Sequence, residues 1–95
     1  LEERLTSLTI DQILELISEL NDQAVFPEGL EDAIIGYVER AGTAPLVLLD
    51  TNKCISILRT EENMSLDEAK EYFEYNILGA FVGDHTPCFA TLLKK

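Results

Sequence analysis

Apolar residues recur at helical spacing along the first half of the chain. Thr9 with Gln12 forms a capping box in front of an amphipathic stretch, which predicts a helix over residues 10–21. Over residues 30–41 the apolar positions recur at i, i+3, i+4, i+7 and i+8, which predicts a second helix. Gly42 suits the left-handed residue that ends such a helix.

The second half of the chain shows two further helix starts. Asp50 or Thr51 is placed to cap a third helix, whose apolar pattern fades in the polar residues that follow. Ser65 with Glu68 forms a second capping box, and behind it one apolar face continues for about fifteen residues. A fourth helix is therefore predicted, with Gly83 as its end.

Two short stretches have the character of strands. Residues 46–49 form a continuous apolar run between turn signals, and residues 88–93 carry aromatic and β-branched side chains after a turn at 84–87. The predicted order is α-α-β-α-α-β. We therefore expect an α+β fold that is predominantly helical, with about four helices packed on a short two-stranded ribbon.

Length and composition set the scale of this fold. The chain has 95 residues, of which 46 % are apolar, enough to form one modest core. No repeat and no long linker divides it, so residues 1–95 are expected to form a single domain.

Charge narrows the possible partners. Eighteen acidic and seven basic residues give a formal net charge of -11, which repels nucleic-acid phosphates and anionic membrane surfaces. Direct binding of nucleic acid or membrane is therefore not expected. The opening Leu1-Glu2-Glu3 lacks the basic flank of a signal peptide, so the expected compartment is the cytoplasm.

The acidic residues form rows on two of the predicted helices. Their spacing of about one helical turn places each row on one face. The rows are Asp11, Glu15, Glu19 and Asp22 on the first helix, and Asp67, Glu71 and Glu74 on the fourth. One hypothesis is that these rows bind a basic protein surface by imitating the phosphates of nucleic acid. The alternative is that they only keep the domain soluble. Charges about 6 Å apart in one row are sparse beside the roughly 1.7 Å per charge of duplex DNA, so mimicry needs several rows on one side.

One segment carries a family resemblance. Residues 72–87 read YFEYNILGAFVGDHTP, and with residues 29–36 and 53–55 they resemble a family of small uncharacterised proteins of tailed bacteriophages and prophages. The family pattern is an FEFN-like tetrapeptide, then Gly-Ala-aromatic-Val-Gly-acid and Thr-Pro. The resemblance covers about two-thirds of the chain and implies a phage or prophage origin, without an established activity. The family usually has Glu in place of Asp84 and no fixed residue at His85, which argues against a catalytic histidine.

The same segment contains a polar patch that is a candidate ligand site, formed by Asn76, Asp84, His85 and Thr86. Asn76 falls on the predicted apolar face, where an unpaired amide would cost on the order of 1 to 3 kcal/mol, so we expect it to bond to the following turn or to a ligand. Adjacent Asp84 and His85 rarely aim at one point, which makes them a poor acid–base pair.

The two cysteines show no spacing for a disulfide framework or a zinc knuckle, and no metal site or cofactor is predicted. Cys54 in the first turn of a helix has the position of a nucleophile, but its apolar neighbours favour a thiol packed in the core. No catalytic residue is assigned.

Three functions remain open from the sequence. The leading hypothesis is a non-enzymatic phage or prophage accessory protein that binds a basic surface of a bacterial protein, as a nucleic-acid mimic or to interfere with host defence. The alternatives are a small enzyme or ligand-binding protein that uses the polar patch, and a homo-oligomer assembled through the edges of its short strands.

Overall fold

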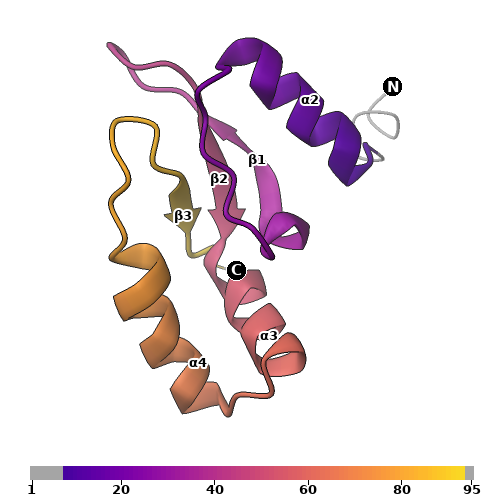
Figure 1. The fold of residues 1–95 in the computed structure, drawn as a ribbon, viewed down its shortest axis with the longest axis vertical. Helices are drawn as coiled ribbons and strands as arrows, with labels where there is room; N and C mark the ends of the chain where they lie inside the picture. Colours follow the sequence, from indigo (N-terminus) through magenta and orange to yellow (C-terminus); the bar gives the residue numbers. More distant parts are fainter. Residues whose placement is uncertain (1–7, 94–95) are drawn as a thin grey trace.

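A computed structural model describes residues 8–93, so the opening Leu1-Glu2-Glu3 lies outside the described residues. The elements, in chain order, are α2 (Ile10–Leu20), a 3-10 turn (Glu31–Ala33), β1 (Ile34–Val38), β2 (Leu46–Asp50), α3 (Thr51–Glu61), α4 (Leu66–Tyr72), a π-helical segment (Phe73–Leu78) and β3 (Cys88–Ala90). The three strands form one sheet in the order β1-β2-β3 (Figure 1).

The sheet is mixed. β1 pairs antiparallel with β2, and β3 pairs parallel with β2 on the other side. α3 and α4 make the crossover between the two parallel strands, because a tight turn cannot join strands that run in the same direction. The predicted α+β class is confirmed, but the two-stranded ribbon is wrong because a third strand completes the sheet.

The additional strand is β1, and it lies where the sequence predicted the second helix. That helix prediction is wrong. Residues 30–41 contain the 3-10 turn and β1 instead of a helix. β-branched and aromatic side chains dominate Ile34–Val38, and in so short a segment helical spacing does not exclude a strand. Gly36 sits at a register shift with φ of 158°, where a side chain would be strained. β1 also pairs the backbone of β2, which would otherwise be left without partners on that side.

The other helix starts are confirmed. Thr9 with Gln12 and Ser65 with Glu68 both form reciprocal capping boxes. Asp50 caps α3 by accepting a hydrogen bond from the backbone N–H of Asn52 at 3.1 Å. These caps satisfy backbone N–H groups that a helix cannot satisfy internally, so local sequence is enough to fix them.

The end of the last helix differs from the prediction. Gly83 does not end it, because α4 widens into the π-helical segment and stops at Gly79. The Gly79 N–H donates to the carbonyl oxygen of Glu74 at 3.1 Å, five residues back. A Cβ on Gly79 would lie 3.0 Å from that same oxygen, so a glycine fits this close approach.

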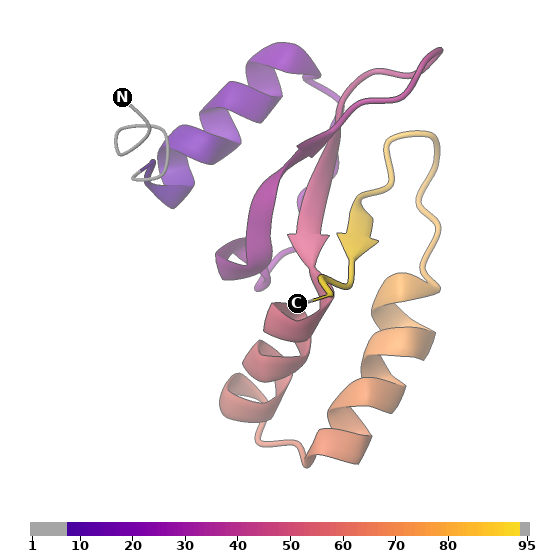
Figure 2. The same ribbon diagram turned by 180° about the vertical axis from the view of Figure 1, so that it is seen from behind.

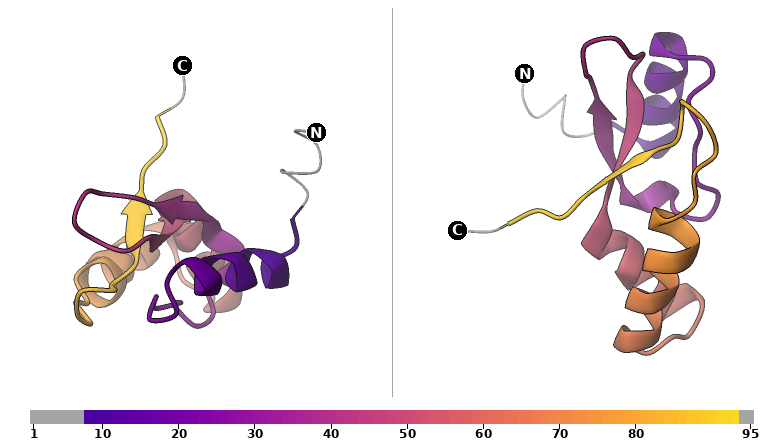
Figure 3. Two further views of the ribbon diagram at one scale, coloured as in Figure 1. Left: turned by 90° about the horizontal axis from the view of Figure 1, so that it is seen from above. Right: turned by 90° about the vertical axis from the view of Figure 1, so that its left-hand side faces the viewer.

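The helices occupy one side of the sheet. Figure 3 shows α2 and α4 on the same side, while α3 continues downward from the end of β2. Figure 2 looks onto the opposite face, with the strands in front and α2 behind them. Within residues 8–93 no helix covers that second face.

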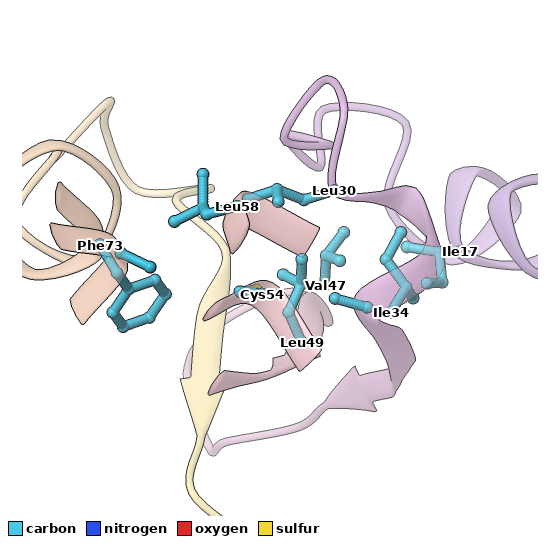
Figure 4. Packing of buried hydrophobic residues seen from close by; sticks show 10 residues of the cluster. Ile17, Leu30, Ile34, Val47, Leu49, Cys54, Leu58 and Phe73 are labelled. Atoms are coloured by element: carbon cyan, nitrogen blue, oxygen red, sulfur yellow. The ribbon is translucent and has the colours of Figure 1, made fainter. Parts of the chain in front are cut away.

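One apolar cluster joins the helices to the covered face. Figure 4 shows it running from Ile17 of α2 through Val47 and Leu49 of β2 to Phe73. Ile17, Val47 and Leu49 are each 0 % exposed. The Phe73 and Phe89 rings meet edge to face at 5.2 Å and 88°, which ties the π-helical segment to β3.

Candidate functional site

A groove opens where four segments meet. The loop that follows α2, the end of α3, the π-helical segment and the chain leading into β3 enclose about 530 Å³. Its floor is apolar and is formed by Leu30, Ile57, Leu58, Ile77 and Phe89. Leu30 and Leu58 are also members of the core, so the groove is a hollow in the surface of the main apolar cluster.

The rim of the groove is acidic. Glu28 lies on one wall, and Glu61 with Glu62 lies on another, at the C-terminal end of α3. All three carboxylate side chains are exposed, and none of the residues described as lining the groove is basic. An apolar floor together with three exposed carboxylates among the described lining residues suits a ligand that is apolar on one side and positively charged on the other.

The π-helical segment shapes the third wall. Tyr72, Asn76, Ile77 and Ala80 line the groove from this side. The sequence places these four residues on an apolar face, and the structure keeps them together but opens the face to the groove. Asn76 is therefore exposed, which contradicts the expectation of a buried amide at this position. π-helical turns are frequent at functional sites, so the widened helix supports this wall as part of a binding site.

The buried amide is Asn21 instead, the residue that ends α2, which is 8 % exposed. Its side-chain N–H donates to the carbonyl oxygen of Pro45 at 2.9 Å, and its oxygen accepts from the backbone N–H of Gln23 at 3.0 Å. Its amide nitrogen also lies 3.0 Å from His85 Nδ1. The two contacts of Asn21 to the backbone fix the orientation of its amide group, so the amide nitrogen is the donor toward His85. Nδ1 of His85 therefore accepts this hydrogen bond, and in the neutral imidazole the proton is on Nε2.

The predicted ligand patch is divided between two hollows. Asn76 lines the groove, whereas Asp84, His85 and Thr86 line a second hollow of about 560 Å³ beside the β1–β2 loop. Thr86 is used within its own turn: its hydroxyl donates to the Gly83 carbonyl at 2.6 Å and accepts from a backbone N–H. The turn residues therefore first serve to hold the turn and to dock it on Asn21.

The acidic rows lie apart. Asp11, Glu15, Glu19 and Asp22 are exposed along and just after α2, and Asp67, Glu71 and Glu74 are exposed along α4 and the start of the π-helical segment. Figures 1 and 2 place these two helices toward opposite ends of the long axis. The structure thus presents two separate acidic strips, and the groove carboxylates belong to neither.

The thiol on α3 belongs to the core. Cys54 is 0 % exposed. Burial raises the pKa of its thiol to about 11, and the charge of nearby Asp50 adds to the shift. The preference for a packed thiol over a nucleophile is confirmed, because a neutral thiol without solvent access is unreactive. Cys88 is only half-buried and lines the second hollow.

Thiol labelling tests this difference. Treatment of the native protein with N-ethylmaleimide at about pH 8 is expected to modify Cys88 and to spare Cys54, because only a thiolate that solvent reaches reacts. Intact-mass measurement should then show one added group, and two after unfolding in guanidinium chloride. Equal rates at both cysteines in the native protein would contradict the burial of Cys54.

Two further findings concern the described residues alone. Within 8–93, no group of three or more His, Cys, Asp and Glu side chains is arranged to hold a metal ion. In the same range, every helix is too short or too polar to span a bilayer.

The sequence analysis did not identify Asn21, which anchors the turn at His85, or the groove carboxylates Glu28, Glu61 and Glu62 as site residues. A signal existed for two of them. Glu61 and Glu62 stand at the C-terminal end of a helix, where the macrodipole disfavours negative charge by about 0.3 to 1 kcal/mol each. Asn21 and Glu28 carry no such local sign, because their roles depend on segments distant in sequence.

Comparison with known proteins adds no further constraint on this geometry. No family model, curated protein or solved structure matches the chain. The resemblance of residues 72–87 to the phage and prophage family remains a prediction from its motif. The groove, its charges and the contacts around it therefore provide the basis for assigning a function.

Proposed function

We propose that this chain is a non-enzymatic protein-binding module that holds a basic, amphipathic segment of another protein in the groove. The observation that carries the proposal is the combination of an apolar floor with three rim carboxylates and no basic lining residue. On the resemblance of residues 72–87, the module is a phage or prophage accessory protein, and its partner is a bacterial protein in the host cytoplasm.

The apolar floor provides the part of the affinity that does not depend on salt. Ile57, Ile77, Val82 and Pro87 are already partly exposed, so an apolar side chain placed among them removes surface from water on both partners. Burial of about 100 Å² of apolar surface contributes on the order of 2.5 kcal/mol before the costs of association. One or two anchoring side chains therefore suffice for a transient complex.

The carboxylates select the charge of the partner. Glu28 lines the groove from the loop after α2, and Glu61 with Glu62 lines it from the end of α3, so a segment in the groove meets negative charge from two elements. A basic residue flanking the apolar anchor gains from this arrangement, and an acidic segment is repelled. The formal charge of -11 on the whole chain attracts basic partners at longer range.

The test uses a defined probe, a fluorescein-labelled amphipathic peptide of leucine and lysine, with binding followed by fluorescence anisotropy. The triple variant Glu28→Gln, Glu61→Gln and Glu62→Gln is expected to bind it about tenfold more weakly, since exposed charge pairs contribute about 0.2 to 1 kcal/mol each. Raising the salt to 0.5 M should weaken wild-type binding and narrow the difference.

The matched control removes the same charge from the acidic strip on α2, through Asp11→Asn, Glu15→Gln and Glu19→Gln. This control is expected to bind the peptide within about twofold of the wild type, because only long-range attraction is lost. An equal loss in both triple variants would show general charge attraction and overturn the groove. A loss of affinity seen only in the control variant would show that the peptide binds at α2 and not in the groove.

Nucleic-acid mimicry is the less favoured form of this function. The strips on α2 and α4 lie toward opposite ends of the molecule, whereas mimicry needs several rows on one side. Interference with a host-defence protein is compatible with the groove, because it requires only a basic amphipathic segment on that protein.

A further inference from the structure

The groove contains one neutral polar group that the proposed function does not use, the side-chain amide of Asn76. Asn76 lies in the π-helical segment and lines the groove together with Tyr72, four residues earlier. Within residues 8–93, the side-chain amides that bond to the fold are those of Gln12 and Asn21, and that of Asn76 is not among them. Since Asn76 is also exposed, its amide is available to a bound partner.

Asn76 differs in chemistry from the other polar side chains described as lining the groove. The carboxylates of Glu28, Glu61 and Glu62 only accept hydrogen bonds when they are ionised, and the Tyr72 hydroxyl has a single proton to donate. The amide of Asn76 has two donor protons and an acceptor oxygen. It can therefore accept from a backbone N–H and donate to a backbone carbonyl of the same bound chain.

We infer that Asn76 pairs with the backbone of the segment held in the groove, and that this segment is bound in an extended conformation. The inference rests on the proposed function, because it concerns the same groove and the same basic, amphipathic partner. In a helix the backbone N–H and C=O groups are paired with one another, whereas an extended segment presents them unpaired along its edge. Peptides are recognised in both ways, and an amide that offers a donor and an acceptor suits the extended one.

The size of the groove favours the same conformation. A helix with its side chains is about 10 Å across, so a hollow of about 530 Å³ encloses little more than one of its turns. Helices docked in grooves present anchors at i, i+3, i+4 and i+7, which spread over two turns. An extended segment turns alternate side chains to opposite sides. It can therefore place an apolar side chain on the floor while its basic neighbours point toward solvent, where the three carboxylates are exposed.

The π-helical widening holds the wall that carries this amide. The hydrogen bond from the Gly79 N–H to the Glu74 carbonyl oxygen, at 3.1 Å, closes a wide turn, and Asn76 lies within that turn. The backbone of Asn76 is therefore fixed before a partner binds. Less conformational freedom is lost on binding when the contacting residue is already held in place.

The conformation of the bound segment is tested with two fluorescein-labelled peptides of equal length and equal leucine and lysine content. In one peptide leucine and lysine alternate, as on a strand; in the other the leucines recur at i, i+3, i+4 and i+7, as on a helix. Fluorescence anisotropy is expected to show severalfold tighter binding of the alternating peptide to the wild type. Equal or tighter binding of the helical peptide would overturn the inference.

The role of Asn76 is tested with the alternating peptide. Asn76→Ala is expected to bind it about tenfold more weakly, the loss that follows when two neutral hydrogen bonds are removed. The loss should persist at 0.5 M salt because no charge is removed, unlike the loss in the triple glutamate variant. Asn52→Ala removes an exposed amide that lines a different hollow and should bind within about twofold of the wild type.

N-methylation of each leucine in the peptide, one at a time, identifies the backbone contact. Methylation of the N–H that Asn76 accepts should weaken binding to the wild type severalfold and binding to Asn76→Ala hardly at all. Equal effects on both proteins, or Asn76→Ala binding within twofold of the wild type while the triple glutamate variant is weakened, would overturn the inference and leave the groove in place. If neither peptide binds the wild type, the proposed function falls as well.

Discussion

Leu49→Ala is expected to lower the free energy of unfolding by about 3 kcal/mol, because truncating a fully buried leucine loses burial and leaves a cavity. Leu49 is 0 % exposed and lies in the central strand, between residues of β1 and β3. Small domains are stabilised by roughly 5 to 15 kcal/mol, so this change removes a large part of the total. Urea unfolding followed by circular dichroism measures it.

Leu93→Ala is the matched control, since this leucine is 88 % exposed. The same chemical change there should alter stability by less than about 0.5 kcal/mol. A loss below about 1 kcal/mol for Leu49→Ala would mean that β2 is not the centre of the core.

Asn21→Ala is expected to destabilise the fold by about 2 kcal/mol, the second large effect. The change leaves the Pro45 carbonyl oxygen and the Gln23 N–H without their partner in a part-buried position. It also releases His85, whose backbone carbonyl accepts a hydrogen bond from the N–H of Val25 at 3.3 Å. Three segments distant in sequence would lose their common anchor.

The hydrogen bond between Asn21 and His85 is measured separately by a double-mutant cycle. With His85→Ala as the second change, a coupling energy of about 1 kcal/mol is expected for a direct contact. Asn76→Ala removes an exposed amide and serves as the control, with an effect of less than about 0.5 kcal/mol. Additive effects of Asn21→Ala and His85→Ala would argue that the two side chains do not interact.

Local sequence predicted the helix starts well and the middle of the chain poorly. Capping boxes such as Thr9 with Gln12 involve residues three apart, and their geometry follows from the backbone alone. Residues 30–41 fit a helical pattern, yet Ile34–Val38 form a strand. Residues 34–38 form a strand because the backbone of β2 needs hydrogen-bond partners on both sides.

The candidate site was predicted only in part. The sequence placed Tyr72, Asn76, Ile77 and Ala80 on one apolar face after Ser65, and these four residues line the groove, but the groove itself was not predicted. The expected convergence with Asp84 and His85 did not occur, since the turn docks on Asn21 at the end of α2. Nothing in the local sequence relates residue 21 to residue 85, because this contact depends on how α2 packs on the sheet.

The sequence by itself determined the elements that depend on neighbouring residues: the caps, the apolar run of β2, the core position of Cys54 and the surplus of negative charge. Only the tertiary structure decided how these elements meet. It converted a predicted helix into β1, separated the two acidic strips, and opened a groove lined by Glu28, Glu61 and Glu62. The physical reason is that backbone pairing and apolar burial between distant segments are satisfied by the whole chain, and no local pattern encodes which segments will meet.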